Sequence, residues 1–461
     1  MELIQNDAWA GTFPVDELGS YEFQIEAWVD HYDTWVDGLE KKAEVESESD
    51  VDLAIGALLL DGAAERAGTD SAAATRAGKL LREAARFLES TDAPLRERAG
   101  RALEEGVIRL ARTYPDRSLA SRSEPALSIT VDPPLARFSA WYELFPRGVY
   151  DDKSDHGTFR SVMAHLDYVS SMGFDVLYLP PIHPIGLAYR KGRNNGLVAD
   201  ADDPGSPWAI GGPEGGHTAI HPALGTAEDF RALVRAAEKR GMKVALDIAF
   251  QCSPDHPWVA EHPEWFVRRP DGSIQYAENP PKKYHDIYPL NFESSEWEEL
   301  WHALKGVFDH WIAEGVSIFR VDNPHTKSFP FWEWCIREIK REHPEVIFLA
   351  EAFTRPRRMY GLAKMGFTQS YTYFAWRTTK TELTQFLTEL ITAEVPEHYR
   401  PSFWPNTPDI LHEYLQQGGT PAFMVRLALA ATLSSNYGIY GPAFELQEAT
   451  PREPGSEEYL D

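Results

Sequence analysis

The stretch Val316-Ser-Ile-Phe-Arg-Val-Asp-Asn-Pro-His-Thr-Lys327 joins a short apolar run, typical of a buried strand, to the polar pair Arg320-x-Asp322. A second apolar run, Val346–Ala350, ends in the same way at Glu351. In a parallel barrel the carboxyl ends of neighbouring strands meet at one mouth, where active sites lie. The two runs therefore predict a barrel with a paired-carboxylate site, which is chemistry suited to cleaving or transferring sugars.

Strand-like and helical segments alternate from residue 136 onward, which predicts βα units with parallel strands. The candidate strands are 138–145, 174–180, 242–250, 316–321, 345–350, 367–371, 402–409 and 436–441. Eight of them predict a (β/α)8 TIM barrel over residues 136–461, of class α/β. Long loops at 181–224 and 251–296 follow two of the strands, so we expect them at the active-site face.

The region before the barrel has a different pattern. Residues 20–30 alternate apolar and polar, with Tyr21, Phe23, Ile25, Ala27 and Val29 on one face, which predicts a half-buried antiparallel strand. Residues 37–114 have apolar residues at helical spacing. The sequence thus predicts an N-terminal β-sandwich-like domain, built from 1–36 and 115–135 and incomplete, that carries a helical insertion at 37–114.

Composition narrows the class of protein. The net charge of −26 over 461 residues argues against nucleic-acid or acidic-membrane partners. Two cysteines, Cys252 and Cys335, are too few for a disulfide framework and favour a reducing compartment. The N-terminus lacks a signal-peptide pattern, and no apolar run approaches the roughly 18–20 residues that span a bilayer. We therefore expect a cytoplasmic protein.

The position of Arg320, two residues before Asp322, favours a catalytic role for Asp322. Side chains two positions apart on a strand share a face, so both should point into the barrel mouth. A buried arginine needs a partner, and a neighbouring carboxylate is the natural one. The pair would favour an ionised Asp322, as a nucleophile requires. The structural alternative is a helix cap, because Asp-Asn-Pro is a good capping sequence.

Glu351 is the second carboxylate. Aromatic neighbours such as Phe353 would raise its pKa into the range of a general acid/base. On adjacent strands the two carboxyl groups would lie about 5–5.5 Å apart, the separation for a retaining mechanism through a covalent glycosyl-enzyme. The structural alternative is a salt-bridge partner.

Longer motifs carry a resemblance to known enzymes. Phe319-Arg-Val-Asp322 and Leu349-Ala-Glu351 resemble the α-amylase family of glycoside hydrolases and transferases. The motifs Leu179–Gly186 with Arg190–Asn195, Gln251–Trp258 and Glu278–Tyr284 are similar to those of maltosyltransferases that extend α-1,4-glucans from α-maltose-1-phosphate.

The resemblance implies roles for particular residues. Asp322 would be the nucleophile, Glu351 the proton donor and Asp409 the stabiliser of the transition state. The implied substrate contacts, with Arg320 included in the site, are Lys191, Gln251, Asp286 and Asn323 for the maltosyl phosphate, and Asn279, Lys282 and Tyr284 on its phosphate side. It also implies a homodimer and a C-terminal β-domain; we expect that domain to be absent here and the chain to be a fragment.

Two departures separate the chain from ordinary amylases. Gln251-Cys252 stands where amylases usually have Asn-His, and Pro408 stands where they have His before the third carboxylate. These departures disfavour a hydrolase or a trehalose-forming enzyme of the same family, which is the first alternative. The second alternative is a non-catalytic glucan-binding scaffold.

A phosphorylated donor requires nearby cations. The candidates are Arg190, Lys191, Arg193, Lys282 and Lys283, and the alternative is that they are solvated loop charges. His183, His217, His221 and His256 do not form a metal-binding motif, so we expect no metal and no cofactor. A buried thiol is the expected state of Cys252.

Overall fold

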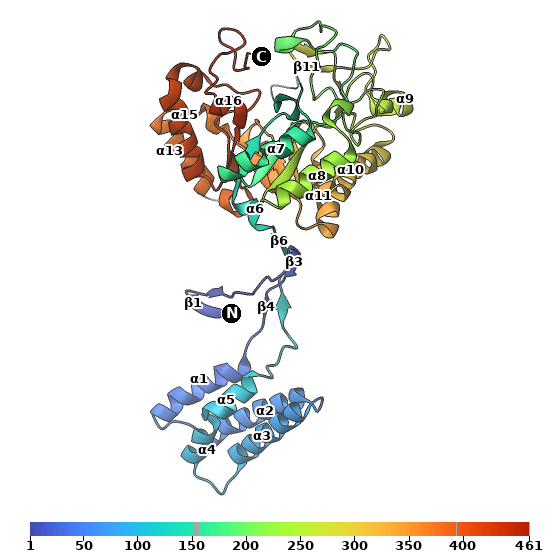
Figure 1. Cartoon of the computed structure of the whole chain (residues 1–461). Coiled ribbons are helices and arrows are strands. Elements are labelled where there is room, and N and C mark those ends of the chain that lie inside the picture. The colour runs from blue at the N-terminus through green and yellow to red at the C-terminus, as the bar shows by residue number, and fades with distance from the viewer. Residues whose placement is uncertain (151–155, 393, 461) are drawn as a thin grey trace. The chain divides into compact units, whose positions relative to one another are not determined.

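Eight parallel strands close into a barrel in the computed structural model of the chain, which describes residues 1–150, 156–392 and 394–460 (Figure 1). The strands are β7 (Ser139–Glu143), β8 (Val176–Leu179), β9 (Lys243–Ile248), β14 (Ile318–Val321), β15 (Ile347–Ala350), β16 (Gln369–Tyr371), β17 (Pro401–Phe403) and β18 (Asn436–Tyr440). The barrel closes where β18 pairs with β7, with Asn436 opposite Ser139. Each strand overlaps a predicted one, so the predicted (β/α)8 barrel is confirmed.

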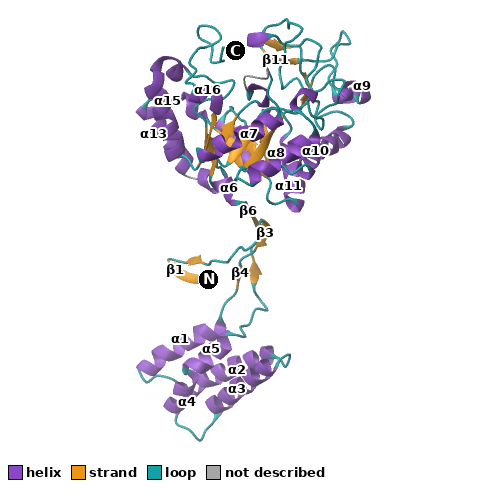
Figure 2. Ribbon diagram, in the orientation of Figure 1, coloured by secondary structure: helices purple, strands orange, loops and turns teal. Residues whose placement is uncertain are grey.

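Helices follow the strands and surround the barrel (Figure 2). In strand order they are α7 (Phe159–Ser171), α8 (Ala227–Glu238), α10 (Trp297–Ala313), α11 (Phe329–Glu342), α12 (Pro356–Lys364), α13 (Lys380–Ile391), α15 (Glu413–Leu433) and α16 (Gly441–Glu445). The start of α8 shows local control by sequence. Thr226 caps the helix and forms a reciprocal capping box with Asp229, which satisfies N–H groups that the helix itself cannot.

The barrel interior changes from apolar to polar toward the carboxyl ends of the strands. One interior layer contains Trp141, Ala245, Ile318 and Leu349, together with Tyr178, Tyr371 and Trp404. Strand side chains alternate between faces, so residues two positions further on point into the same space. These residues are Glu143, Asp247, Arg320 and Glu351, and all four are buried. The strand period thus places four ionisable groups at the barrel mouth.

Residues Tyr21–Ile129 form a unit of their own, distinct from Met1–Ser20 with Thr130–Asp461. Its helices are α1 (His31–Glu44), α2 (Asp50–Ala67), α3 (Ala72–Glu89), α4 (Leu95–Ala102) and α5 (Glu105–Arg112). They cover the stretch predicted to be helical and begin at His31 rather than near residue 37. Leu53, Leu60, Leu81 and Leu88 are fully buried between them, with alanines that allow close helix contact.

The strands before the barrel differ from the expected sandwich. Among the described residues they form three separate two-stranded sheets. These are β1 (Glu2–Gln5) with β2 (Ala8–Ala10), β3 (Gly19–Phe23) with β6 (Leu127–Val131), and β4 (Glu26–Ala27) with β5 (Ser121–Arg122). Their side chains are mostly exposed, so these short strands bury no shared face of the kind that packs two sheets together.

The single half-buried strand expected over residues 20–30 is wrong. The alternation changes face after Phe23, so that Ile25 and Val29 are exposed while Glu26 and Trp28 are partly buried. Arg117 explains the change, because its guanidinium donates to Glu26 at 3.2 Å and lies 4.3 Å from the ring centroid of Trp28. A cation that covers both side chains outweighs the apolar pattern.

Candidate active site

Arg320 joins three carboxylates at the barrel mouth. Its Nη1 donates to both carboxylate oxygens of Asp247, at 3.1 and 2.9 Å, and to Oδ1 of Asp322 at 3.0 Å. Its Nη2 lies 2.9 Å from Oε1 of Glu351. The predicted pairing of Arg320 with Asp322 is therefore present. The alternative of Asp322 as a helix cap is wrong, since Asn323 is the N-terminal cap residue of the following 3-10 helix, Pro324–Thr326.

Strand register explains why these groups meet. β14 lies between β9 and β15, and Arg320 is level with Asp247 on one side and with Leu349 on the other. Asp322 and Glu351 each follow these positions by two residues and therefore share the interior face. One planar guanidinium can bind several carboxylates because its N–H groups are fixed in a fork.

Glu351 has the surroundings of a general acid. Its pKa is raised to about 8, chiefly by burial and also by the charges of Asp322 and Asp409, and this value includes the opposing effect of Arg320. The backbone N–H of Asn323 donates to Oε2 of Glu351 at 3.3 Å. Asn323 can do this because it has a left-handed backbone, with φ of 43°. The pKa is shifted in the predicted direction, and the causes are burial and the neighbouring carboxylates.

Asp409 lies at the open side of the same charge cluster. It follows β17 and its side chain is exposed to solvent. The walls of the concave site nevertheless raise its pKa, as does Asp322, while Arg320 lowers it. Because the charges of Arg320 and Asp322 shift the pKa of Asp409, the third predicted carboxylate belongs to the same mouth of the barrel.

Two buried acids at this mouth were not predicted as site residues. Asp247 accepts from Tyr178 Oη at 2.6 Å and Trp208 Nε1 at 3.2 Å, and burial raises its pKa to about 6. Glu143 is 2% exposed, its Oε2 has no hydrogen-bond partner among the described residues, and burial raises its pKa well above the ordinary value. Each of these acids lies within an apolar strand run. Burial of a carboxylate is costly unless it is paired, so its presence there could have indicated a role in the site.

Three predicted substrate contacts lie around the loops that follow β8 and β9. Lys191 and Asp286 are both buried, and the charge of Lys191 lowers the pKa of Asp286 against the effect of burial. Oδ1 of Asp286 has no hydrogen-bond partner in the described part of the chain, which leaves an acceptor for a ligand hydroxyl. Gln251 donates through Nε2 to the carbonyl oxygen of Trp208 at 3.2 Å.

The other predicted contacts belong to a hairpin of β11 (Ala277–Asn279) and β12 (Lys282–Tyr284), in which Asn279 is opposite Lys282. The side chains of Asn279 and Lys282 are exposed, and Tyr284 packs against a small apolar cluster that includes Ile287. Lys282 Nζ lies 2.8 Å from Oε1 of Glu458. The predicted phosphate-binding lysine therefore has an anionic partner from the chain itself.

The predicted cation group is not uniform. Arg190 donates to the carbonyl oxygens of Gly186, Asp203 and Ile185, so its guanidinium stabilises the loop. Arg193 is exposed and lies 3.8 Å from Asp203. Lys283 is also exposed. Arg190 is therefore a half-buried loop residue rather than a solvated charge, and three of its five N–H groups bind carbonyl oxygens.

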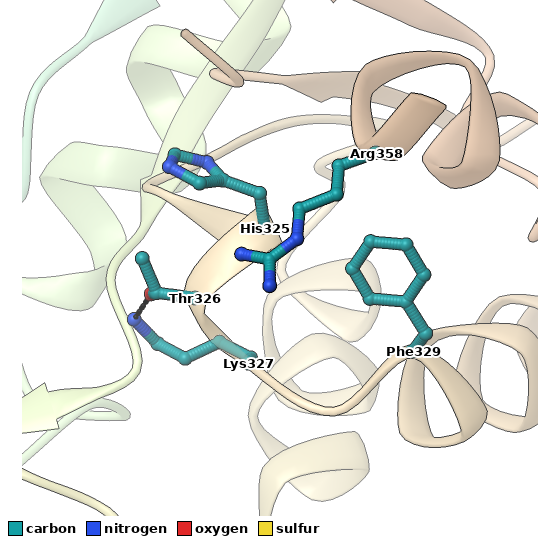
Figure 3. Close-up of a pocket in the computed structure, with 5 residues that line it drawn as sticks. All are labelled: His325, Thr326, Lys327, Phe329 and Arg358. Atoms are coloured by element: carbon teal, nitrogen blue, oxygen red, sulfur yellow. Dashed lines mark hydrogen bonds between the residues drawn. The ribbon is translucent and has the colours of Figure 1, made fainter. Parts of the chain in front are cut away.

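A cavity of about 390 Å³ lies between the segment that follows β14 and helix α12 (Figure 3). His325, Thr326, Lys327, Phe329 and Arg358 line it. Lys327 was quoted in the opening stretch but not singled out. Burial lowers its pKa, and the charges of Asp322 and Glu351 raise it, so this ammonium group lies within electrostatic range of the two carboxylates.

His217, Cys252 and His256 are close enough to one another to hold a metal ion. Their donors are already engaged, however. His217 Nδ1 lies 3.0 Å from His256 Nε2, His217 Nε2 lies 3.0 Å from the carbonyl oxygen of Ala249, and His256 Nδ1 accepts from the N–H of Trp258. Burial lowers the pKa of both imidazoles to about 3 and raises that of the Cys252 thiol. One set of tautomers satisfies all these contacts without an ion.

Among the helices of the described residues, none combines the length and apolar character needed to cross a bilayer.

Comparison with known proteins gives consistent results along the chain. Residues 1–133 match the family described as α-1,4-glucan:maltose-1-phosphate maltosyltransferase, domain N/S, and residues 142–303 match the α-amylase catalytic domain. A protein from Chlorobaculum tepidum, named α-1,4-glucan:maltose-1-phosphate maltosyltransferase, is 54% identical over all of this chain, which spans 68% of that protein. A protein of the same name from Mycolicibacterium smegmatis is 52% identical over 99% of this chain and 65% of its own length.

Solved structures agree on the fold. An α-amylase from Lactobacillus plantarum superposes with a TM-score of 0.52 at 24% identity, over 71% of this chain and 75% of that one. At this identity the likeness supports the barrel fold and not a particular activity.

Proposed function

Because this chain belongs to the α-1,4-glucan:maltose-1-phosphate maltosyltransferase family, we propose that it transfers maltosyl units from α-maltose-1-phosphate to the non-reducing end of α-1,4-glucans and releases phosphate. The observation that carries the mechanism is the contact of one guanidinium, that of Arg320, with both Asp322 and Glu351. Two carboxyl groups on neighbouring strands are what a retaining displacement requires.

In the first step Asp322 attacks the anomeric carbon of the donor, and the bond from that carbon to the phosphate oxygen breaks. Glu351, protonated because its pKa is raised, gives its proton to the departing phosphate. Asp409 stabilises the positive charge that develops on the sugar ring in the transition state. The product of this step is a maltosyl ester of Asp322.

In the second step Glu351 acts as the base. It takes the proton of the glucan 4-hydroxyl, whose oxygen then attacks the anomeric carbon and releases Asp322. Two inversions give net retention. Protonated Glu351 is restored, so the proton count balances over the cycle.

The remaining predicted residues supply binding. Lys191, Gln251, Asp286 and Asn323 would contact the maltosyl phosphate, and Asn279, Lys282 and Tyr284 would line its phosphate side. We assign the cavity beside Lys327 to the acceptor glucan, because Lys327 and Arg358 can donate to hydroxyls and the ring of Phe329 offers an apolar face. The proposal includes a homodimer located in the cytoplasm.

The test is an incubation with α-maltose-1-phosphate and a short maltooligosaccharide, followed by measurement of phosphate and of glucan length. Phosphate release with chain growth in steps of two glucose units supports the proposal. Phosphate without longer chains indicates a hydrolase, and neither product indicates a non-catalytic binding protein. Light scattering of the same preparation measures the oligomeric state.

A further inference from the structure

Glu458 lies between two cations at the edge of the active site. Its Oε1 is 2.8 Å from Nζ of Lys282, and Nη1 of Arg452 contacts its Oε2. Lys282 belongs to the β11–β12 hairpin in the loop after β9, whereas Glu458 comes from the loop after α16. The ion pair therefore joins two segments that are 176 residues apart in the sequence.

The loop that carries Glu458 is fixed on the barrel by its own contacts. Tyr459 Oη accepts from Asn406 Nδ2 at 2.8 Å, and the carboxylate of Glu457 accepts from Trp376 Nε1 at 2.9 and 3.1 Å. The N–H of Arg452 also donates to the carbonyl oxygen of Glu458 at 2.8 Å. The carboxylate is thus presented to Lys282 by a loop that does not need the Lys282 contact for its position.

The charges of the ion pair act on one of the proposed catalytic acids, Asp409. The pKa of Asp409 is raised by the charge of Glu458 and lowered by that of Lys282. Both charges therefore act at the open side of the cleft, where Asp409 is exposed. The proposed function assigns the phosphate of the donor to Lys282.

The chemistry of the pair favours exchange. The side chain of Lys282 is 55% exposed and that of Glu458 is 26% exposed, and exposed ion pairs of this kind are weak. A phosphate monoester carries about −1.5 to −2 charge and three acceptor oxygens, so it is a stronger partner for an ammonium group than one carboxylate oxygen. A neutral glucan hydroxyl has no charge with which to replace the carboxylate.

We propose that Glu458 is a specificity-determining residue whose carboxylate occupies, on Lys282, the position that the phosphate of the donor takes. The inference rests on the proposed function and deepens it. A phosphorylated donor gains Lys282 by displacing Glu458, which stays paired with Arg452. A neutral glucan leaves the Lys282–Glu458 pair closed, and the site therefore selects the phosphorylated donor.

The test compares Glu458→Gln with Glu453→Gln, a matched control in the same loop with the same change in charge. Glu453 is 69% exposed and lies 3.6 Å from Arg452. In Glu458→Gln the KM for α-maltose-1-phosphate and the Ki for inorganic phosphate should fall about three- to tenfold, since the competing exposed pair is removed. Glu453→Gln should change neither. A KM or Ki in Glu458→Gln that stays the same or rises overturns the inference, since a purely structural pair would weaken donor binding when broken.

A double-mutant cycle separates exchange at Lys282 from the loss of a negative charge near the site. In a Lys282→Gln background, Glu458→Gln should no longer lower the Ki for inorganic phosphate. An equal decrease in both backgrounds contradicts competition for Lys282. If the unmutated chain releases no phosphate from the donor in the presence of a glucan, the proposed function itself fails; an active chain with an unchanged Glu458→Gln variant disproves only this inference.

Discussion

Asp322 and Glu351 are bound by the same side chain, with Arg320 Nη1 3.0 Å from the first carboxylate and Nη2 2.9 Å from the second. The planar guanidinium fixes the relative positions of the two groups to which we assign nucleophilic attack and proton transfer. A reaction in two displacements depends on that fixed geometry.

Asp322→Asn keeps the size of the side chain and removes the nucleophile. We expect kcat to fall by about 10⁴-fold or more, as for the loss of other catalytic nucleophiles. The measurement is phosphate release from α-maltose-1-phosphate, with circular dichroism to verify the fold. A variant that retained a tenth of the turnover would disprove the assignment of Asp322.

Glu351 should set the alkaline limit of activity. Burial raises its pKa to about 8, so the acid loses its proton as the pH rises through that value, and kcat/KM for the donor should decline above about pH 8. Glu351→Gln should remove this decline and lower turnover by about 10²–10⁴-fold. An unchanged alkaline limb in Glu351→Gln would mean that another group controls it.

The same shift has a signature in stability. A carboxyl group whose pKa is raised from 4.5 to about 8 on folding binds more protons in the folded than in the unfolded state between these values. Its contribution to the free energy of unfolding therefore falls as the pH rises from about 4.5 to 8. We expect the Tm of Glu351→Gln relative to the unmutated chain to increase from pH 5 to pH 8. A constant difference would contradict the raised pKa.

Asn323 combines a backbone role with a proposed contact to the donor. Asn323 has a left-handed backbone, which glycine adopts without strain. In alanine the Cβ is strained in this conformation, and there is no polar side chain whose local hydrogen bonds could offset the strain. Asn323→Gly should preserve Tm and raise KM for the donor, while Asn323→Ala should also lose about 1 kcal/mol of unfolding free energy. Equal effects of the two substitutions on Tm would indicate that the left-handed backbone is not strained.

A partly buried ion network at the amino ends of the strands should affect stability and not turnover. Asp132 contacts Nζ of Lys340 and lies 2.7 Å from Nη1 of Arg400, the residue before β17. The amino ends of barrel strands lie opposite the active site. Asp132→Asn leaves two cations without their carboxylate and should cost about 1–3 kcal/mol of unfolding free energy, with kcat unchanged at 20 °C. Exposed Asp309→Asn serves as control, and a decrease in kcat would show that the network acts on the site.

The parts of the site that follow from local periodicity were predictable. The two-residue strand period places Arg320 with Asp322, and the strand ends place Glu351 beside them. Asp247 and Glu143 were not recognised, because the local sequence around an acid in an apolar strand does not show which residues of other segments it will contact. Contacts between loops, such as Lys282 with Glu458, depend on the folded path of segments far apart in the chain. The expected strand over residues 20–30 failed for the same reason, since Arg117, distant in sequence, decides which face is covered.

Closure of the barrel between its first and last strands has a consequence for synthesis. Ser139 Oγ donates to Asn436 Oδ1 across 297 residues of sequence. At about 5–20 residues per second, a ribosome needs roughly 15–60 s to translate the intervening chain. During that time the edge of β7 that will pair with β18 remains unpaired, because β18 has not yet been made. This edge of β7 therefore stays open until β18 has been made, and the barrel that holds the active site closes only after that.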